Sequence, residues 1–115
     1  MNYEQALALI LSLLSPNERA HAVVYALPEP VSEGVALAAG PQRVVAATRS
    51  YIGFVDREPL ANWGHPARYL LVDAQTGKVA SIEARFPPFG PKKDTRWRVV
   101  YSAAGLPNSI LAAPK

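Results

Sequence analysis

Residues 67–86, ARYLLVDAQTGKVASIEARF, contain the signal that decides the fold of this chain. On both sides of the segment 73–77, apolar and polar side chains alternate as they do in the two strands of a half-buried hairpin. Asp73 can accept hydrogen bonds from turn amides, and Gly77 supplies the positive φ that a hairpin loop requires. The pattern therefore predicts an antiparallel hairpin from Ala67 to Phe86, with one apolar face and one solvated face.

A helix is predicted at the start of the chain. Asn2 and Gln5 have the spacing of a capping box, which places the first helical residue at Tyr3. Pro16 disfavours helical geometry at the preceding residue, so the helix should end at Ser15 or just before. Its apolar stripe follows the i, i+3, i+4, i+7 rule at Leu7, Ile10, Leu11 and Leu14.

The apolar stripe of this helix is wider than one sheet face requires, because Ala6, Leu9 and Leu13 extend it. One interpretation is that the helix lies in a concave sheet. The other is that a second copy of the chain covers the outer flank, which would give a homodimer through the N-terminal helix.

Further strands are predicted on both sides of the hairpin. Residues 21–27, HAVVYAL, are rich in residues that favour strands. Residues 43–48 and 51–55 form either two short strands or one long one, and we favour a single bent or bulged strand with Gly53 near the irregularity. Residues 95–102 alternate again, with three side chains on one face, namely Trp97, Val99 and Tyr101.

This order of elements predicts an α+β fold, with one N-terminal helix packed across a curved antiparallel sheet of four to five strands. A chain of 115 residues is large enough for one core, so residues 1–115 are expected to form one domain. The segment 103–115 contains two prolines and Gly105, and we expect it to be a loosely packed tail.

Composition excludes several classes of protein. Half of the residues are hydrophobic and 18% are charged, which excludes general disorder. The absence of cysteine excludes disulfides, thiolate metal sites and cysteine nucleophiles. A formal charge of +3 permits an acidic partner but is small for a dedicated nucleic-acid binder.

No motif points to catalysis or to a cofactor. The two histidines, His21 and His65, lie far apart in the sequence and neither belongs to an HxH or HxxxH pattern, so no metal site is predicted. The chain has no G-x-S-x-G motif and no glycine-rich phosphate loop. We therefore predict no catalytic residues, no cofactor and no enzymatic activity.

Two irregular segments are the candidate contact surface for another protein. Residues 56–66, DREPLANWGHP, carry Arg57, Trp63 and His65 on a loop of mixed chemistry. The proline-rich segment 87–93 follows the hairpin and adds three candidates, Phe89, Lys92 and Lys93. A purely structural role is the alternative for the first loop, with Trp63 covering the end of the core. An exposed sheet edge that accepts a partner strand is a further mode of binding.

A nucleic-acid-binding module is the alternative function. Residues 85–98 combine aromatic side chains with five basic ones, a pattern that suits phosphate pairing and base stacking. The basic residues are Arg85, Lys92, Lys93, Arg96 and Arg98. However, strand alternation places Trp97 on the opposite face from its two neighbouring arginines, which favours a core position for the tryptophan.

The sequence contains no pattern typical of membrane insertion or export. The apolar run 6–14 is too short to span a bilayer. Ala20 and Ala22 have the A-x-A form of a cleavage site, but Glu4 stands where a signal peptide carries a cation. The compartment stays open, with the cytoplasm favoured.

The run from Tyr69 to Val79, YLLVDAQTGKV, resembles the Y-x-V-x-V-D-A-x-T-G-x-V hairpin of PepSY-type and related protease-propeptide domains. A helix followed by a small antiparallel sheet is similar too, in the manner of cystatin-like folds. The resemblance implies a small non-enzymatic module that binds or inhibits a peptidase, or that lies beside one as a propeptide. We expect the partner to be another protein, with a peptidase as one candidate.

Overall fold

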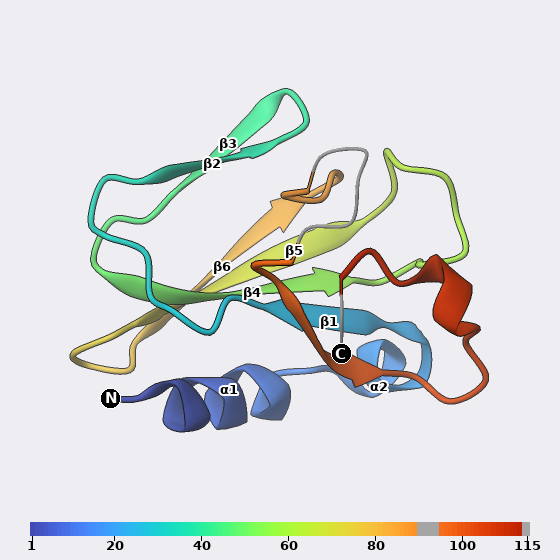
Figure 1. Ribbon diagram of the computed structural model, residues 1–115, viewed down its shortest axis with the longest axis horizontal. Helices are drawn as coiled ribbons and strands as arrows, with labels where there is room; N and C mark the ends of the chain where they lie inside the picture. The colour runs from blue at the N-terminus through green and yellow to red at the C-terminus, as the bar shows by residue number, and fades with distance from the viewer. Residues whose placement is uncertain (90–94, 114–115) are drawn as a thin grey trace.

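The computed structural model describes residues 1–89 and 95–113, and it confirms the α+β fold (Figure 1). Helix α1 (Tyr3–Ser12) lies across one face of a five-stranded antiparallel sheet with the strand order β6-β5-β4-β1-β7. A separate two-stranded sheet, β2-β3, lies over the opposite face (Figure 1). The strands are β1 (Val23–Ala26), β2 (Ala36–Ala39), β3 (Gln42–Val45), β4 (Ser50–Asp56), β5 (Ala67–Asp73), β6 (Val79–Ala84) and β7 (Arg98–Ser102).

Helix α1 begins where the sequence predicts. The Asn2 side chain accepts a hydrogen bond from the Gln5 backbone at 2.9 Å, and the Gln5 side chain accepts one from the Asn2 backbone at the same distance. The helix ends at Ser12, a little before the end at Ser15 that the position of Pro16 predicts. Ala6, Ile10 and Leu14, which share one face, are buried against the sheet.

A second helix, α2 (Pro16–His21), occupies a region for which no helix was predicted. Ser15 caps it: its hydroxyl accepts a hydrogen bond from the Glu18 backbone at 3.1 Å, and the Ser15 backbone donates to the Glu18 carboxylate at 2.8 Å. Pro16 is the first helical residue, a position at which proline needs no hydrogen-bond donor. Strand β1 consequently begins at Val23 and not at His21.

The predicted hairpin is confirmed as β5 and β6. Gly77 has a φ of +76°, and the Asp73 carboxylate accepts hydrogen bonds from the backbones of Gln75 and Thr76, each at 2.8 Å. Hydrogen bonds from the Thr76 backbone, the Thr48 side chain and the Gln75 backbone lower the pKa of Asp73 to about 2. The turn is thus fixed by its own polar groups.

The prediction of one solvated face for the hairpin is wrong for β5, which is buried at five of its seven positions. Its neighbour β4 is buried at every residue. Side chains on one face of these strands pack with α1, and those on the other face pack with the β2-β3 hairpin and the segment after β7. Within the hairpin, the edge strand β6 retains exposed positions.

Gly53 has a packing role that differs from the predicted one. Residues 42–45 and 50–56 form two strands in different sheets, so the single bent strand was wrong. Gly53 lies within the regular ladder of β4, opposite Leu70 and Ala26. A Cβ atom there would stand 3.0 Å from the Cγ2 atom of Ile10. The glycine therefore permits close approach of α1 to the sheet.

Strand β7 does not keep the alternation that its sequence suggests. Val99 pairs with Tyr25, whereas Tyr101 pairs with Val24, because the register shifts between Val24 and Tyr25. Val99 consequently packs on the β2-β3 side and Tyr101 on the α1 side, so they do not share the predicted face. A bulge of this kind changes the face that each later side chain occupies.

The segment after β7 lies against the core, although the sequence suggested a loose tail. A 3-10 helix spans Asn108–Ile110, and Ala113 is buried. The Ala112 backbone donates a hydrogen bond to the Tyr25 hydroxyl at 3.2 Å. Among residues 1–89 and 95–113, no helix is long and apolar enough to cross a membrane.

Candidate functional site

The loop between β4 and β5, residues 57–66, is closed by a buried pair of side chains at its base. The His65 Nε2 atom lies 2.7 Å from the Asp56 carboxylate, and the His65 Nδ1 atom lies 2.7 Å from the Asn62 carbonyl oxygen. Both His65 and Asp56 are buried. Asp56 also accepts a hydrogen bond from the Glu58 backbone at 3.1 Å. These contacts fix both ends of the loop.

The geometry assigns the protons of this pair. A carbonyl oxygen only accepts, so Nδ1 of His65 carries a proton that it donates to Asn62. One further proton must lie between Nε2 and the Asp56 carboxylate, because two lone pairs at that distance would repel. Burial raises the pKa of Asp56, and the hydrogen bond and charge of His65 offset only part of that increase.

Trp63 is an exposed aromatic side chain on a fixed support. Its ring stacks on the His65 imidazole, with centroids 4.4 Å apart and planes inclined by 18°. The Trp63 ring also neighbours Phe54 of the core, with ring centroids 6.0 Å apart. The tryptophan nevertheless remains 42% exposed, and Leu60 on the same loop is 72% exposed. Large exposed apolar side chains that are held in place are typical of contact surfaces.

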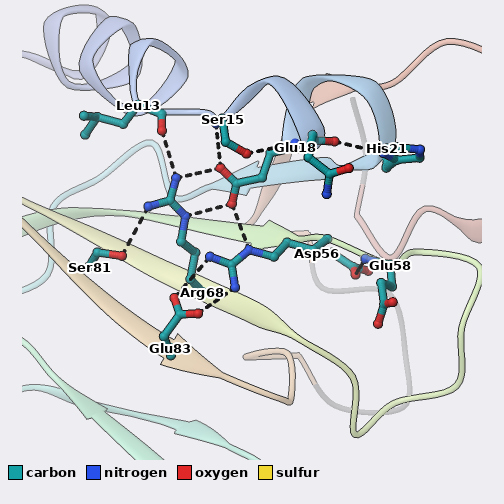
Figure 2. Close-up of polar contacts among 11 residues, drawn as sticks. Leu13, Ser15, Glu18, His21, Asp56, Glu58, Arg68, Ser81 and Glu83 are labelled. Atoms are coloured by element: carbon teal, nitrogen blue, oxygen red, sulfur yellow. Dashed lines mark hydrogen bonds and ion pairs between the residues drawn. The ribbon is translucent and has the colours of Figure 1, made fainter.

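A network of charged side chains joins this loop to α2 and to β6 (Figure 2). The buried Glu18 carboxylate accepts hydrogen bonds from Arg57 Nε at 2.9 Å, and from Arg68 Nε and Nη2 at 2.9 and 2.7 Å. Arg57 also makes a two-pronged contact with Glu83, at 2.7 and 3.1 Å. Arg68 further donates to the Leu13 carbonyl oxygen at the end of α1.

The electrostatics of the network agree with its geometry. Burial alone would raise the pKa of Glu18, but hydrogen bonds from Arg68, the Ser15 backbone and Arg57 more than compensate and hold it below its usual value. The Arg57 guanidinium lowers the pKa of Glu83. Both carboxylate partners of Arg57, Glu18 and Glu83, are therefore charged near neutral pH, and they determine the direction in which the loop leaves β4.

An open groove of about 650 Å³ lies between α2, the first half of the loop and the segment after β7. Its walls include apolar groups of Leu60, Pro59 and Leu106, together with the polar side chains of His21 and Arg57. The Nδ1 atom of His21 is bound to the Asn17 carbonyl oxygen at 3.0 Å. The exposed Leu60 therefore stands beside a concave, largely apolar surface.

The structure brings together only some of the residues that the sequence singled out. Trp63, His65 and Arg57 belong to one loop and its base. Phe89 is partly buried against the core, where its ring packs edge-on against Tyr25 with centroids 4.9 Å apart. Its ring and that of Trp63 both neighbour Phe54, with centroids 5.9 and 6.0 Å away. Lys92 and Lys93 lie outside the described residues.

The basic segment 85–98 lacks a stacking platform at its tryptophan. Trp97 is 1% exposed and packs against Phe89 in the core. Arg85, Arg96 and Arg98 are exposed, and Arg98 donates to the Thr95 carbonyl oxygen at 2.8 Å. Trp97 is therefore not accessible for the base stacking that the nucleic-acid alternative requires of it.

Sequence reasoning missed the acidic and basic residues that organise the site. Glu18, Arg68 and Glu83 were not singled out, nor was Leu60. A signal for Glu18 was present, because Ser15, Pro16 and Glu18 form the S-x-x-E pattern with proline at the first helical position. The Arg68 and Glu83 pair becomes visible once the hairpin register makes them cross-strand neighbours.

The groups at this site differ in what they offer to a ligand. His65 is buried with both ring nitrogens engaged, so it presents no free nitrogen to a ligand. Among residues 1–89 and 95–113, no group of three or more histidine and acidic residues is placed to hold a metal ion. The large exposed apolar groups of the loop are the Trp63 indole and the Leu60 side chain, beside the exposed polar side chains of Glu58 and Asn62. Apolar groups of this kind bind by burial of apolar area.

Comparisons of the chain with protein-family models, with curated proteins and with solved structures find no match. The functional argument therefore rests on the geometry of the loop and its supports.

Proposed function

We propose that this chain is a small non-enzymatic module that binds another protein through the loop 57–66. The observation that carries the proposal is the exposed indole of Trp63, stacked on a buried histidine whose two ring nitrogens are both fixed. Tryptophan is among the residues that most often dominate protein interfaces. Here it shares the loop with the exposed Leu60, which lines the adjoining groove.

The rigidity of the support favours binding. An interface residue that is mobile in the free protein must lose side-chain and loop entropy on association, which costs about 0.5–1.5 kcal/mol per side chain. The Asp56 and His65 pair closes the loop, and the bond network of Arg57 fixes its first residue. Much of this side-chain and loop entropy is consequently lost when the chain folds, so little more is lost on binding.

The resemblance of the hairpin to PepSY-type and protease-propeptide domains makes a peptidase the first partner class to test. An inhibitor-like or propeptide-like module needs no catalytic group of its own, which suits a site built from an indole, an aliphatic side chain and a groove. In this proposal the partner inserts between Trp63 and Leu60 and covers both.

Affinity capture from a lysate of the source organism tests the proposal. The bait proteins are the wild type, the double variant Trp63→Ala with Leu60→Ala, and the control Val35→Ala. Val35 is also an exposed apolar residue, at 39%, but it lies just before β2 and outside the loop. We expect one protein to be retained by the wild type and the control and lost from the double variant, because hot-spot truncation costs about 2 kcal/mol or more.

Titration of that purified protein against the same three variants then gives the affinities. A weakening of at least about tenfold in the double variant, at unchanged thermal stability, supports binding through the loop. Equal binding by all three variants would refute it. A retained peptidase whose activity falls on binding would identify the inhibitor-like role, whereas capture of nucleic acid alone, released by salt, would favour the basic segment instead.

A further inference from the structure

The two edges of the main sheet differ in how they are protected. Strand β7 carries a register shift against β1, and bulges of this kind prevent the pairing of sheet edges. Strand β6 forms the other edge and pairs with β5 without any shift from Val79 to Ala84. Its sequence, VASIEA, contains no proline and no lysine, and its one charged residue, Glu83, is bound to Arg57. The part of β6 before Glu83 therefore has little protection against edge pairing.

The hydrogen bonds at both ends of β6 show which residues face outward. The Lys78 carbonyl oxygen accepts a bond from Asp73, so Lys78 faces β5. The Glu83 carbonyl oxygen accepts a bond from the Gln42 side chain, so Glu83 faces away from β5. Because backbone groups alternate along a strand, Val79 and Ser81 also face outward.

The outward backbone groups of Val79 and Ser81, N–H and C=O alike, have no hydrogen-bond partner among the described residues. The next outward group, the Glu83 carbonyl oxygen, is occupied by Gln42, and past the end of the strand the Arg85 carbonyl oxygen accepts a bond from Gly64. The free edge is thus a short segment with two donors and two acceptors.

We infer that this segment pairs with β6 of a second copy of the chain, antiparallel and about a two-fold axis at Ala80. In this register Val79 of each copy lies opposite Ser81 of the other. The two pairs exchange four backbone hydrogen bonds, which use all four open groups and leave the contacts of Gln42 and Gly64 intact.

The side chains of β6 suit this register. Ala80, which is exposed, faces Ala80 of the second copy, and small side chains permit the close spacing of such a pair. Lys78 faces Ile82 of the second copy, so no like charges stand opposite each other. Beside the axis lies a groove lined by Val45, Leu71 and Ile82, with a volume of about 330 Å³, which apolar groups of the second copy would cover.

The dimer would be a continuous ten-stranded sheet, and the binding loop would remain free. The loop packs at the far end of β6, where Gly64 donates to the Arg85 carbonyl oxygen. A two-fold axis at Ala80 therefore places the two loops at opposite ends of the joined strands, roughly 30 Å apart at 3.3 Å per residue. The pairing is independent of the proposed function of the loop.

Light scattering after size exclusion, over loading concentrations from about 1 to about 500 µM, tests the pairing. We expect the wild type to approach twice the 12.4 kDa mass of one chain at the upper end. The variant Ala80→Lys should stay at the monomer mass, because it places two lysines opposite each other at the axis. The control Ala38→Lys adds the same charge at an exposed position of β2 and should dimerise as the wild type does.

A charge-swap mixture separates loss of pairing from loss of folding. Ala80→Lys and Ala80→Asp should each be monomeric alone, and an equimolar mixture should recover the dimer mass, because lysine then faces aspartate. A wild type that stays monomeric throughout the range would overturn the proposal. So would a dimer that persists in Ala80→Lys, which would point to another surface such as the outer flank of α1.

Discussion

Replacement of Glu18 by glutamine tests whether the buried carboxylate holds the site together. Glu18 is 3% exposed and accepts bonds from Arg57, Arg68 and the Ser15 backbone. Glutamine has nearly the same shape, but its amide nitrogen replaces one oxygen and presents hydrogen atoms to a guanidinium group. The substitution therefore removes charge and acceptors without creating a cavity.

The expected loss of stability in Glu18→Gln follows from how far its partners, Arg57 and Arg68, are exposed to water. Removing one member of a fully buried ion pair costs about 3–5 kcal/mol. Here the Arg57 and Arg68 side chains are 25% and 14% exposed, so water can solvate them in part, and Arg57 retains its bonds to Glu83. We expect a loss of about 2–3 kcal/mol in the free energy of unfolding. For a domain of this size that corresponds to a fall of about 8–12 °C in Tm.

Urea unfolding followed by circular dichroism measures this loss. The control is Glu4→Gln, the same substitution at an exposed position in the first turn of α1, for which we expect less than about 0.5 kcal/mol. Combining Glu18→Gln with Arg68→Met should cost less than the sum of the two single changes, because the second removes the cation that the first leaves unpaired. A Glu18→Gln protein as stable as the control would refute the reasoning.

The acid dependence of stability gives an independent readout of Glu18. Its pKa in the folded protein lies below the usual carboxyl value, so folding is favoured by its charged form. This contribution is fully present above the ordinary pKa of about 4.3, and it is lost as pH falls through the lowered value. Glu18→Gln should therefore show a shallower decline of stability in acid than the wild type.

Two other predictions concern a glycine turn and the base of the loop. Gly40→Ala should lower the free energy of unfolding by about 2–3 kcal/mol, because the glycine has a φ of +63° and a new Cβ would stand 2.6 Å from the Phe86 ring. The control is Gly34→Ala, whose glycine has a φ of +85° but no neighbour within 4 Å. In the same urea assay this control should lose only about 1 kcal/mol. Burial raises the pKa of Asp56, so its contribution to stability should fall as pH rises from about 4 through that raised value. Asp56→Asn should lack this part of the pH profile, and an unchanged profile would contradict the assignment.

The parts of the fold that could be predicted from the sequence are those determined by neighbouring residues. The capping box of α1 and the Asp73 to Gly77 turn involve residues within five positions of each other, and both appear in the structure. Helix α2 carried a comparable local signal at Ser15 and Glu18, but Pro16 was interpreted only as the end of the preceding helix. That error arose from the interpretation and not from a lack of information.

Other features depend on contacts between distant segments. The burial of both faces of β4 needs the β2-β3 hairpin on one side and α1 on the other. Its sequence, SYIGFVD, is nearly continuous in apolar residues, a pattern that accompanies burial on both faces. The bulge that separates Val99 from Tyr101 depends on the register with β1, and strand alternation within one sequence cannot reveal it.

The candidate site shows the same division. Trp63 and His65 could be singled out because aromatic and titratable residues on an irregular loop are easily recognised. Glu18 could not be connected with them, because 39 positions separate it from Arg57. The proximity of the two residues results from the packing of α2 against the sheet, which only the folded chain shows.

The charged network makes the loop 57–66 and the sheet edge parts of one structural unit. Arg57 begins the loop and contacts two carboxylates, Glu18 on α2 and Glu83 on β6. Any displacement of the loop must therefore break bonds to β6 or move that strand with it. Because Glu83 lies two residues beyond Ser81, the last outward residue of the proposed pairing segment, pairing of β6 would hold the Glu83 partner of Arg57 in place. The stability of the edge strand and the orientation of the loop are consequently linked through one guanidinium group.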